Sequence, residues 1–87
     1  MTIRVAQPSL LSARAGLETD VVHAIEASQW RAALDAARTE LTRAERLLAE
    51  RAVPGRRVED ARRAVGVADA RLQASEARLA QRDQVLG

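Results

Sequence analysis

Residues 41–66 read LTRAERLLAERAVPGRRVEDARRAVG, and the pair Pro54-Gly55 separates two runs rich in Ala, Leu, Arg and Glu. These four residue types have high helix propensity, whereas Pro and Gly end helices. Residues 19–52 contain neither Pro nor Gly, and residues 57–86 contain only Gly66. The sequence therefore predicts one helix over about 19–52 and a second over about 57–86.

Small and apolar residues recur along both predicted helices in alternating steps of three and four, the heptad pattern of a coiled coil. Because the turn over 53–56 is short, the helices should lie antiparallel. Folding the chain about Pro54-Gly55 places Leu41 opposite Ala68 and Leu34 opposite Ser75, large against small. The predicted fold class is all-α, a two-helix antiparallel coiled-coil hairpin with an Ala-rich seam. The predicted seam comprises Ala27, Trp30, Leu34, Ala37, Leu41, Ala44, Leu48 and Arg51 in the first helix, and Val58, Ala61, Val65, Ala68, Leu72, Ser75, Leu79, Arg82 and Leu86 in the second.

Residues 1–16 are predicted to form a short N-terminal arm ahead of a hairpin that spans 17–87. The arm opens with strand-like alternation, and Pro8 could start a short helical turn that Gly16 closes. We expect this arm to be flexible or to form that single helical turn.

The composition excludes several classes of site. Nineteen of the 87 residues are alanine, and the chain has no Cys, Phe, Tyr or Lys. Disulfides and Cys-ligated zinc are therefore excluded. The one histidine, His23, has only Asp20 and Glu26 as near acids, which is too common an arrangement to indicate catalysis or metal binding. We expect no enzyme activity, no cofactor, no metal and no small-molecule substrate.

The charge pattern and the hydropathy bound the partners and the location. The formal net charge is +2, with 14 Arg against 12 Asp and Glu. No segment has the ~18 consecutive apolar residues that cross a membrane, and the first 16 residues lack the apolar stretch of a signal peptide. We expect a cytoplasmic protein without a membrane span.

A second stripe, on the side of the hairpin away from the seam, is the candidate partner-binding face. Leu17, Val21 and Ile25 are branched apolar residues at successive spacings of four, and such residues seldom face water in a row. Trp30 can be read as a core residue or as an interface anchor. Ala70 and Ala74 also belong to this stripe, and the alternative explanation for them is that alanine is simply a good helix former. The candidate partner-binding residues are Leu17, Val21, Ile25, Trp30, Ala70 and Ala74.

Arginines gather around the predicted turn, at the tip of the hairpin. Arg51, Arg56, Arg57 and Arg63 are candidate contacts to an anion or to nucleic acid, because guanidinium groups bind phosphate. The alternative is a solvated tip, since Glu59 is spaced for an ion pair with Arg63 and no aromatic residue is near to stack on bases.

Residues 41–54, LTRAERLLAERAVP, resemble the end of the first helix and the turn in the small helical-hairpin co-chaperones of bacterial type III secretion needle subunits. Proteins of that family are cytoplasmic. They act jointly with a tetratricopeptide-type chaperone to bind the needle subunit. The chain departs from them in its N-terminal arm and its longer second helix. The resemblance implies that the face with Val21 and Ile25 meets the chaperone.

These features favour a non-enzymatic helical interaction module, a chaperone-like or adaptor subunit that docks on partner helices. Two alternatives stay open at this point. One is a structural component of a phage or secretion assembly that forms homo-oligomers through its outer stripes. The other is nucleic-acid binding through the arginine-rich tip, which the interleaved charges make less favoured.

Overall fold

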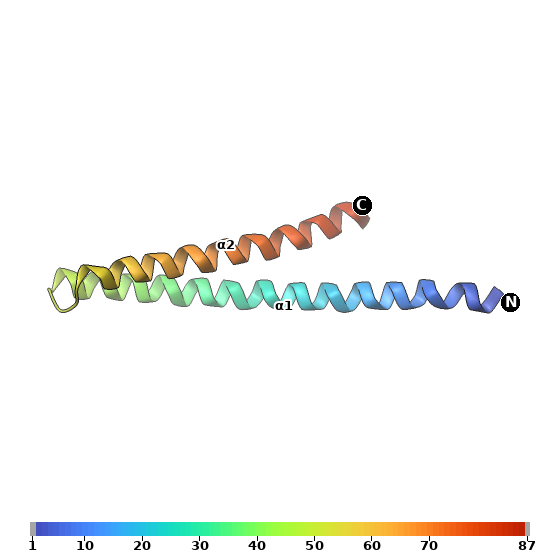
Figure 1. The fold of residues 1–87 in the computed structure, drawn as a ribbon, viewed down its shortest axis with the longest axis horizontal. Helices are drawn as coiled ribbons and strands as arrows, with labels where there is room; N and C mark the ends of the chain where they lie inside the picture. Colours follow the sequence, from blue (N-terminus) through green and yellow to red (C-terminus); the bar gives the residue numbers. More distant parts are fainter. Residues whose placement is uncertain (1, 87) are drawn as a thin grey trace.

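The computed structural model describes the backbone of residues 2–86 and the side chains of residues 18–81. It contains two helices, α1 (Thr2–Ala49) and α2 (Gly55–Leu86), which pack along each other as an antiparallel hairpin (Figure 1). The molecule is a rod of 76 × 18 × 14 Å. The prediction of an all-α helical hairpin is therefore confirmed.

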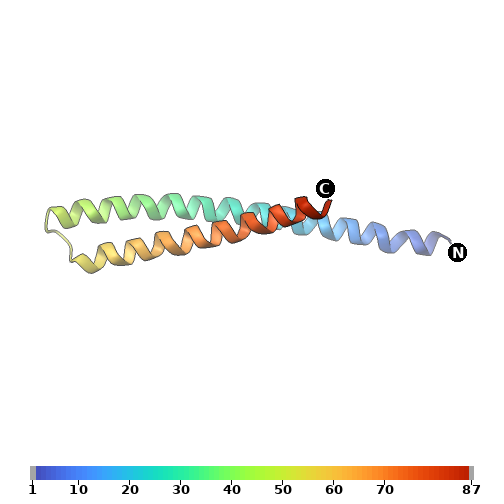
Figure 2. The same cartoon turned by 90° about the horizontal axis from the view of Figure 1, so that it is seen from above.

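The two helices differ in length, so α2 covers only part of α1. A helix rises about 1.5 Å per residue, which makes α1 about 72 Å long and α2 about 48 Å long. The N-terminal portion of α1 extends beyond the end of α2 in both views (Figures 1 and 2). Toward the C-terminus of α2 the two helices diverge (Figure 1).

The segment predicted as a separate arm continues the first helix. The helix runs through Pro8 and Gly16 from Thr2, whereas the sequence suggested that it begins at about residue 19. The physical reason is composition. The neighbours of Pro8 and Gly16 include Ala, Leu, Arg and Gln, all good helix formers, and these act against the cost of about 3 kcal/mol that a Pro imposes inside a helix.

The turn lies nearer the N-terminus than predicted. The first helix ends at Ala49, and Arg51 takes a left-handed conformation with φ 59°. The Ala52 N–H donates to the Leu47 carbonyl at 2.8 Å, and the Arg51 N–H donates to the Leu48 carbonyl at 2.8 Å. This pair of bonds is a Schellman motif, which satisfies the last carbonyls of a helix and usually has Gly at the left-handed position.

The second helix starts at Gly55, directly after Pro54. The Pro54 carbonyl accepts a hydrogen bond from the Arg57 N–H at 3.0 Å. Pro54 itself lacks an N–H group, so it is well placed just outside a helix start, where that donor would have no partner in the helix. The chain thus reverses over residues 50–54, not over 53–56.

The seam is confirmed along most of its length. The buried side chains of the described range all belong to the predicted heptad positions: Ala27, Leu34, Ala44, Val58, Ala68, Leu72 and Ser75. The prediction is wrong at the end of α1, where Leu48 is 38% exposed and Arg51 is exposed. The Schellman turn ends the helix there, so these two residues have left the seam.

The predicted register of the seam is wrong by about one heptad. Leu34 shares a buried cluster with Ala68 and Leu72, whereas folding about Pro54-Gly55 placed it opposite Ser75. The cause is the position of the turn. Moving the reversal by about three residues toward the N-terminus shifts each partner by about twice that number, close to one heptad. A shift of one heptad keeps the same residues in the seam.

Candidate docking groove

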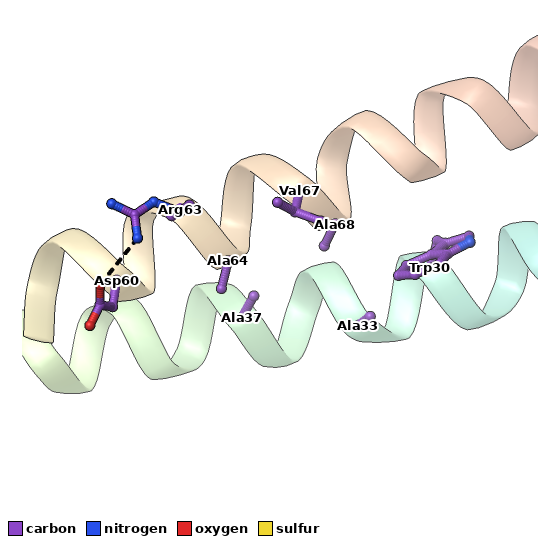
Figure 3. Close-up of a pocket in the computed structure, with 8 residues that line it drawn as sticks. All are labelled: Trp30, Ala33, Ala37, Asp60, Arg63, Ala64, Val67 and Ala68. Atoms are coloured by element: carbon purple, nitrogen blue, oxygen red, sulfur yellow. Dashed lines mark hydrogen bonds and ion pairs between the residues drawn. The ribbon is translucent and has the colours of Figure 1, made fainter.

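An apolar groove runs along one side of the hairpin, between the two helices (Figure 3). Its volume is about 510 Å³. Ala37 and Ala64 direct their methyl groups toward each other across the groove, and Trp30 lies at the end away from the tip (Figure 3). The lining residues are Trp30, Ala33 and Ala37 of α1 and Asp60, Arg63, Ala64, Val67 and Ala68 of α2.

The groove exists because small residues flank the seam at this level. The heptad period places Ala33 beside Leu34 and Ala64 beside Val65, one position away from the core. A methyl group at these positions covers little of the space between two helices. Val67 borders the hollow with 49% of its surface exposed. The result is a shallow apolar channel of the shape that receives the ridge of another helix.

A pair of charged residues marks the end of the groove nearest the tip. Arg63 Nη1 lies 3.4 Å from Asp60 Oδ1, and both side chains are more than half exposed. The sequence suggested that Arg63 pairs with Glu59, which is the residue next to Asp60 in the same helix. Such an exposed pair contributes about 0–1 kcal/mol to the free energy of folding, so its main effect is to place polar groups at the rim.

The groove continues past Trp30 into a more polar hollow of about 350 Å³. The Arg71 guanidinium carbon lies 5.0 Å from the centroid of the Trp30 ring, and Arg71 lines this second hollow. Arg78 donates to Glu26 at 3.3 Å and so bridges α2 to α1. The residues that line this second hollow are Glu26, Gln29, Trp30, Arg71, Ala74, Ser75 and Arg78.

A second bridge between the helices, from Arg31 to Glu76 at 3.3 Å, involves residues that line neither hollow. The heptad positions of Arg31 and Glu76 put this bridge on the other side of the seam. The two bridges flank the seam where the helices diverge. The groove and its polar continuation therefore lie on the side of the Arg78–Glu26 bridge, and the Arg31–Glu76 bridge lies on the opposite side.

The residues predicted as partner-binding fall into two groups. Trp30 and Ala74 line the groove or its polar continuation, and Ala70 is exposed beyond it. Val21 and Ile25 lie elsewhere, on the free surface of α1, with exposed fractions of 57% and 51%. The side chain of Leu17 lies outside the described range.

Sequence reasoning missed three residues of this surface: Val22, Ala33 and Ala64. Val22 is 51% exposed, and it precedes Ala33 by eleven residues, about three helical turns, so the two share a face of α1. Ala33 and Ala64 line the groove. The sequence signal for Ala33 and Ala64 was their position next to the seam. Where both helices have a small residue there at the same level, a hollow is left between them.

The four candidate arginines of the tip are exposed, as the anion-binding prediction requires. Arg63 is paired with Asp60 in the structure. Arg51 belongs to the Schellman turn, and Arg56 and Arg57 lie in the first turn of α2. The expected role in binding an anion or nucleic acid stays a prediction.

Within the described residues, no group of three or more His, Asp or Glu side chains could hold a metal ion. His23 is half-buried near the open end. No helix in the described part of the chain is long and apolar enough to span a membrane. The sequence matches no known family, and neither the curated proteins nor the solved structures contain a match.

Proposed function

We propose that the chain is a non-enzymatic interaction module that packs a partner helix into the groove beside its seam. It would act in the cytoplasm as a chaperone-like or adaptor subunit of a larger assembly. The observation that carries this proposal is the groove itself, with Trp30 at one end, alanines along its floor and half-exposed Val67 at its border.

The surface area of the molecule supports the proposal. The accessible surface is 7023 Å². A compact monomer of 9.5 kDa exposes about 5,000 Å². The excess of about 2,000 Å² is more than the roughly 800 Å² that each partner buries in a typical protein–protein interface. A hairpin of two helices buries one stripe per helix, so the remaining apolar stripes need a further helix to cover them.

The distribution of apolar residues also supports a helix as the ligand. The exposed large hydrophobic side chains of the described range are Val21, Val22, Ile25, Leu48 and Val67. A helix laid along the groove from Val67 toward Trp30 would meet small residues that allow close approach of the backbones, with Trp30 as an aromatic anchor. The resemblance of residues 41–54 to secretion co-chaperones favours the same kind of partner.

The test is recovery of a partner by the tagged full chain from extracts of its source cells, followed by mass spectrometry. Val67→Asp places a charge in the groove, and Val21→Asp with Ile25→Asp places charges on the outer stripe. Ala24→Asp is a matched control, because Ala24 is exposed on α1 and lies outside the groove.

We expect Val67→Asp to reduce recovery of the partner about tenfold or more, because a buried unpaired charge in an interface is costly. The Ala24→Asp protein should recover the partner as the unmodified chain does. Loss of recovery only in the Val21→Asp, Ile25→Asp protein would move the docking site to the outer stripe. Equal recovery by every variant would overturn the proposal.

A further inference from the structure

The charges of the chain are divided between the two ends of the hairpin. Residues 43–63, which form the tip, contain seven arginines and four acids. Residues 18–40, the part of α1 that runs beside the C-terminal half of α2, contain five acids and two arginines, and residues 2–17 of α1 add Arg4 and Arg14. Residues 64–81 of α2 contain two of each sign. The paired part of the hairpin therefore has a basic tip and an acidic half toward the open end.

From this charge distribution and the groove we infer that the groove side binds a second copy of the chain. The second copy lies antiparallel to the first. The inference rests on the proposed function and names its partner. The groove sides of the two hairpins would pack together, and the four helices would form a bundle with a two-fold axis. Each basic tip then lies beside the acidic half of the other copy.

The charges decide between the two ways of pairing identical hairpins through one face. A two-fold axis along the helices would place tip against tip and acidic half against acidic half, which opposes like charges at both ends. A two-fold axis across the helices reverses one copy and opposes unlike charges at both ends. The electrostatic energy therefore favours the antiparallel arrangement.

The groove occupies the position that this axis requires. Its lining residues Trp30, Ala33 and Ala68 lie near the middle of the stretch over which α2 accompanies α1, and Ala37 and Ala64 lie between there and the tip. An axis there superimposes the paired parts of the two hairpins, and alanine at the axis lets the helices approach closely. Trp30 then lies close to the centre of the interface, where hot-spot residues concentrate.

The area is sufficient for a stable dimer. The paired part of the hairpin is about 48 Å long, and the rod is 18 Å wide. One such face measures on the order of 800 Å², which is what each partner buries in a typical specific interface. The N-terminal parts of α1 would project from both ends of the dimer, since α2 does not accompany them (Figure 1).

The experiment is sedimentation equilibrium of the full chain over a range of concentrations at low salt, with two complementary variants. The acidic variant carries Arg56→Glu and Arg57→Glu at the tip. The basic variant carries Glu18→Arg and Asp20→Arg on α1. Acids are favourable in the first turn of a helix, so the acidic variant should keep its fold, and circular dichroism checks both.

We expect the unmodified chain to dimerise, with an affinity that falls as salt is added. Each variant alone should dimerise at least about tenfold more weakly, because both of its ends carry the same sign. An equimolar mixture should return to within about threefold of the unmodified affinity, since the two variants then complement each other.

Three results would overturn the inference. If the unmodified chain is monomeric at every concentration, the second copy is not the partner, while loss of a cellular partner in Val67→Asp would leave the proposed function standing. If the chain dimerises but the mixture is no stronger than either variant alone, the antiparallel arrangement is wrong. If the dimer is unaffected by Val67→Asp, its contact surface is not the groove.

Discussion

The guanidinium carbon of Arg71 in α2 lies 5.0 Å from the centroid of the Trp30 ring in α1. The only aromatic side chain of the protein is thus held by a cation from the opposite helix. Trp30 also packs against the buried cluster of Ala27, Leu34, Ala68 and Leu72. The contact joins the core of the hairpin to its docking groove, because Trp30 belongs to both.

Replacement of Arg71 by Ala should lower the free energy of unfolding by about 0.5–1 kcal/mol, the contribution of a partly exposed cation–π contact. The emission of Trp30 should shift to the red, since its ring becomes more accessible to water. Urea unfolding followed by tryptophan fluorescence measures both effects. Arg71→Lys keeps the charge without the planar group and should give a smaller loss. An unchanged midpoint and spectrum in Arg71→Ala would show that the contact contributes nothing.

Leu34 and Leu48 were predicted as equivalent seam positions, and the structure separates them. Leu34 is 4% exposed and Leu48 is 38% exposed. Leu34→Ala should cost about 2–4 kcal/mol through lost burial and a cavity, whereas Leu48→Ala should cost less than about 1 kcal/mol. Leu34→Met, which preserves volume, should cost less than about 1.5 kcal/mol and keeps the test readable if the alanine variant does not fold. Equal losses at both positions would contradict the observed end of the seam.

Ser75 is 1% exposed, and no described residue forms a hydrogen bond with its side chain. Burial of a hydroxyl without a partner costs about 1–3 kcal/mol. Ser75→Ala should therefore raise the free energy of unfolding by about 1 kcal/mol in chemical denaturation. Ser28→Ala, at an exposed position of α1, should have a much smaller effect. A loss of stability in Ser75→Ala would mean that the hydroxyl has a partner in solution, such as a water molecule.

Gly66 lies inside α2, where a Cβ atom would meet nothing within 4 Å. Gly66→Ala should stabilise the hairpin by about 0.5–1 kcal/mol, because glycine loses more backbone freedom than alanine when a helix forms. Gly55 is equally open but stands at the first residue of α2, so Gly55→Ala should change stability less. Thermal unfolding by circular dichroism compares the two variants. Destabilisation by Gly66→Ala would require that its exposed surface be covered by another chain.

Arg51 has φ 59°, a conformation that costs a residue with a Cβ atom roughly 1 kcal/mol relative to glycine. Arg51→Gly should therefore raise the melting temperature without changing the fold. Ala52→Gly is the control, since Ala52 does not have a positive φ, and it should be neutral or destabilising. A lower melting temperature in Arg51→Gly would indicate that the Arg51 side chain contributes to the turn.

The residues of the candidate site were only partly predictable. Trp30 was recognised as the one large aromatic residue, and Ala74 as a small residue outside the seam. Val22, Ala33 and Ala64 were missed because their role depends on the neighbouring helix. An alanine beside a seam can be covered by a long side chain from across the interface or left as the floor of a groove. Which of the two occurs depends on the register, and the register depends on where the turn ends each helix.

The heptad spacing and the single Pro-Gly break by themselves determined that the chain is a helical hairpin and most of the residues that form its seam. Both follow from periodicity and local propensity, which neighbouring residues along the chain dictate. The tertiary structure decided the register and the location of the groove. The reason is that a heptad repeat is satisfied equally well by registers one heptad apart. The observed register goes with the Schellman turn at Leu47–Ala52, in which Arg51 has a left-handed conformation, and with the packing of Leu34 on Ala68 and Leu72.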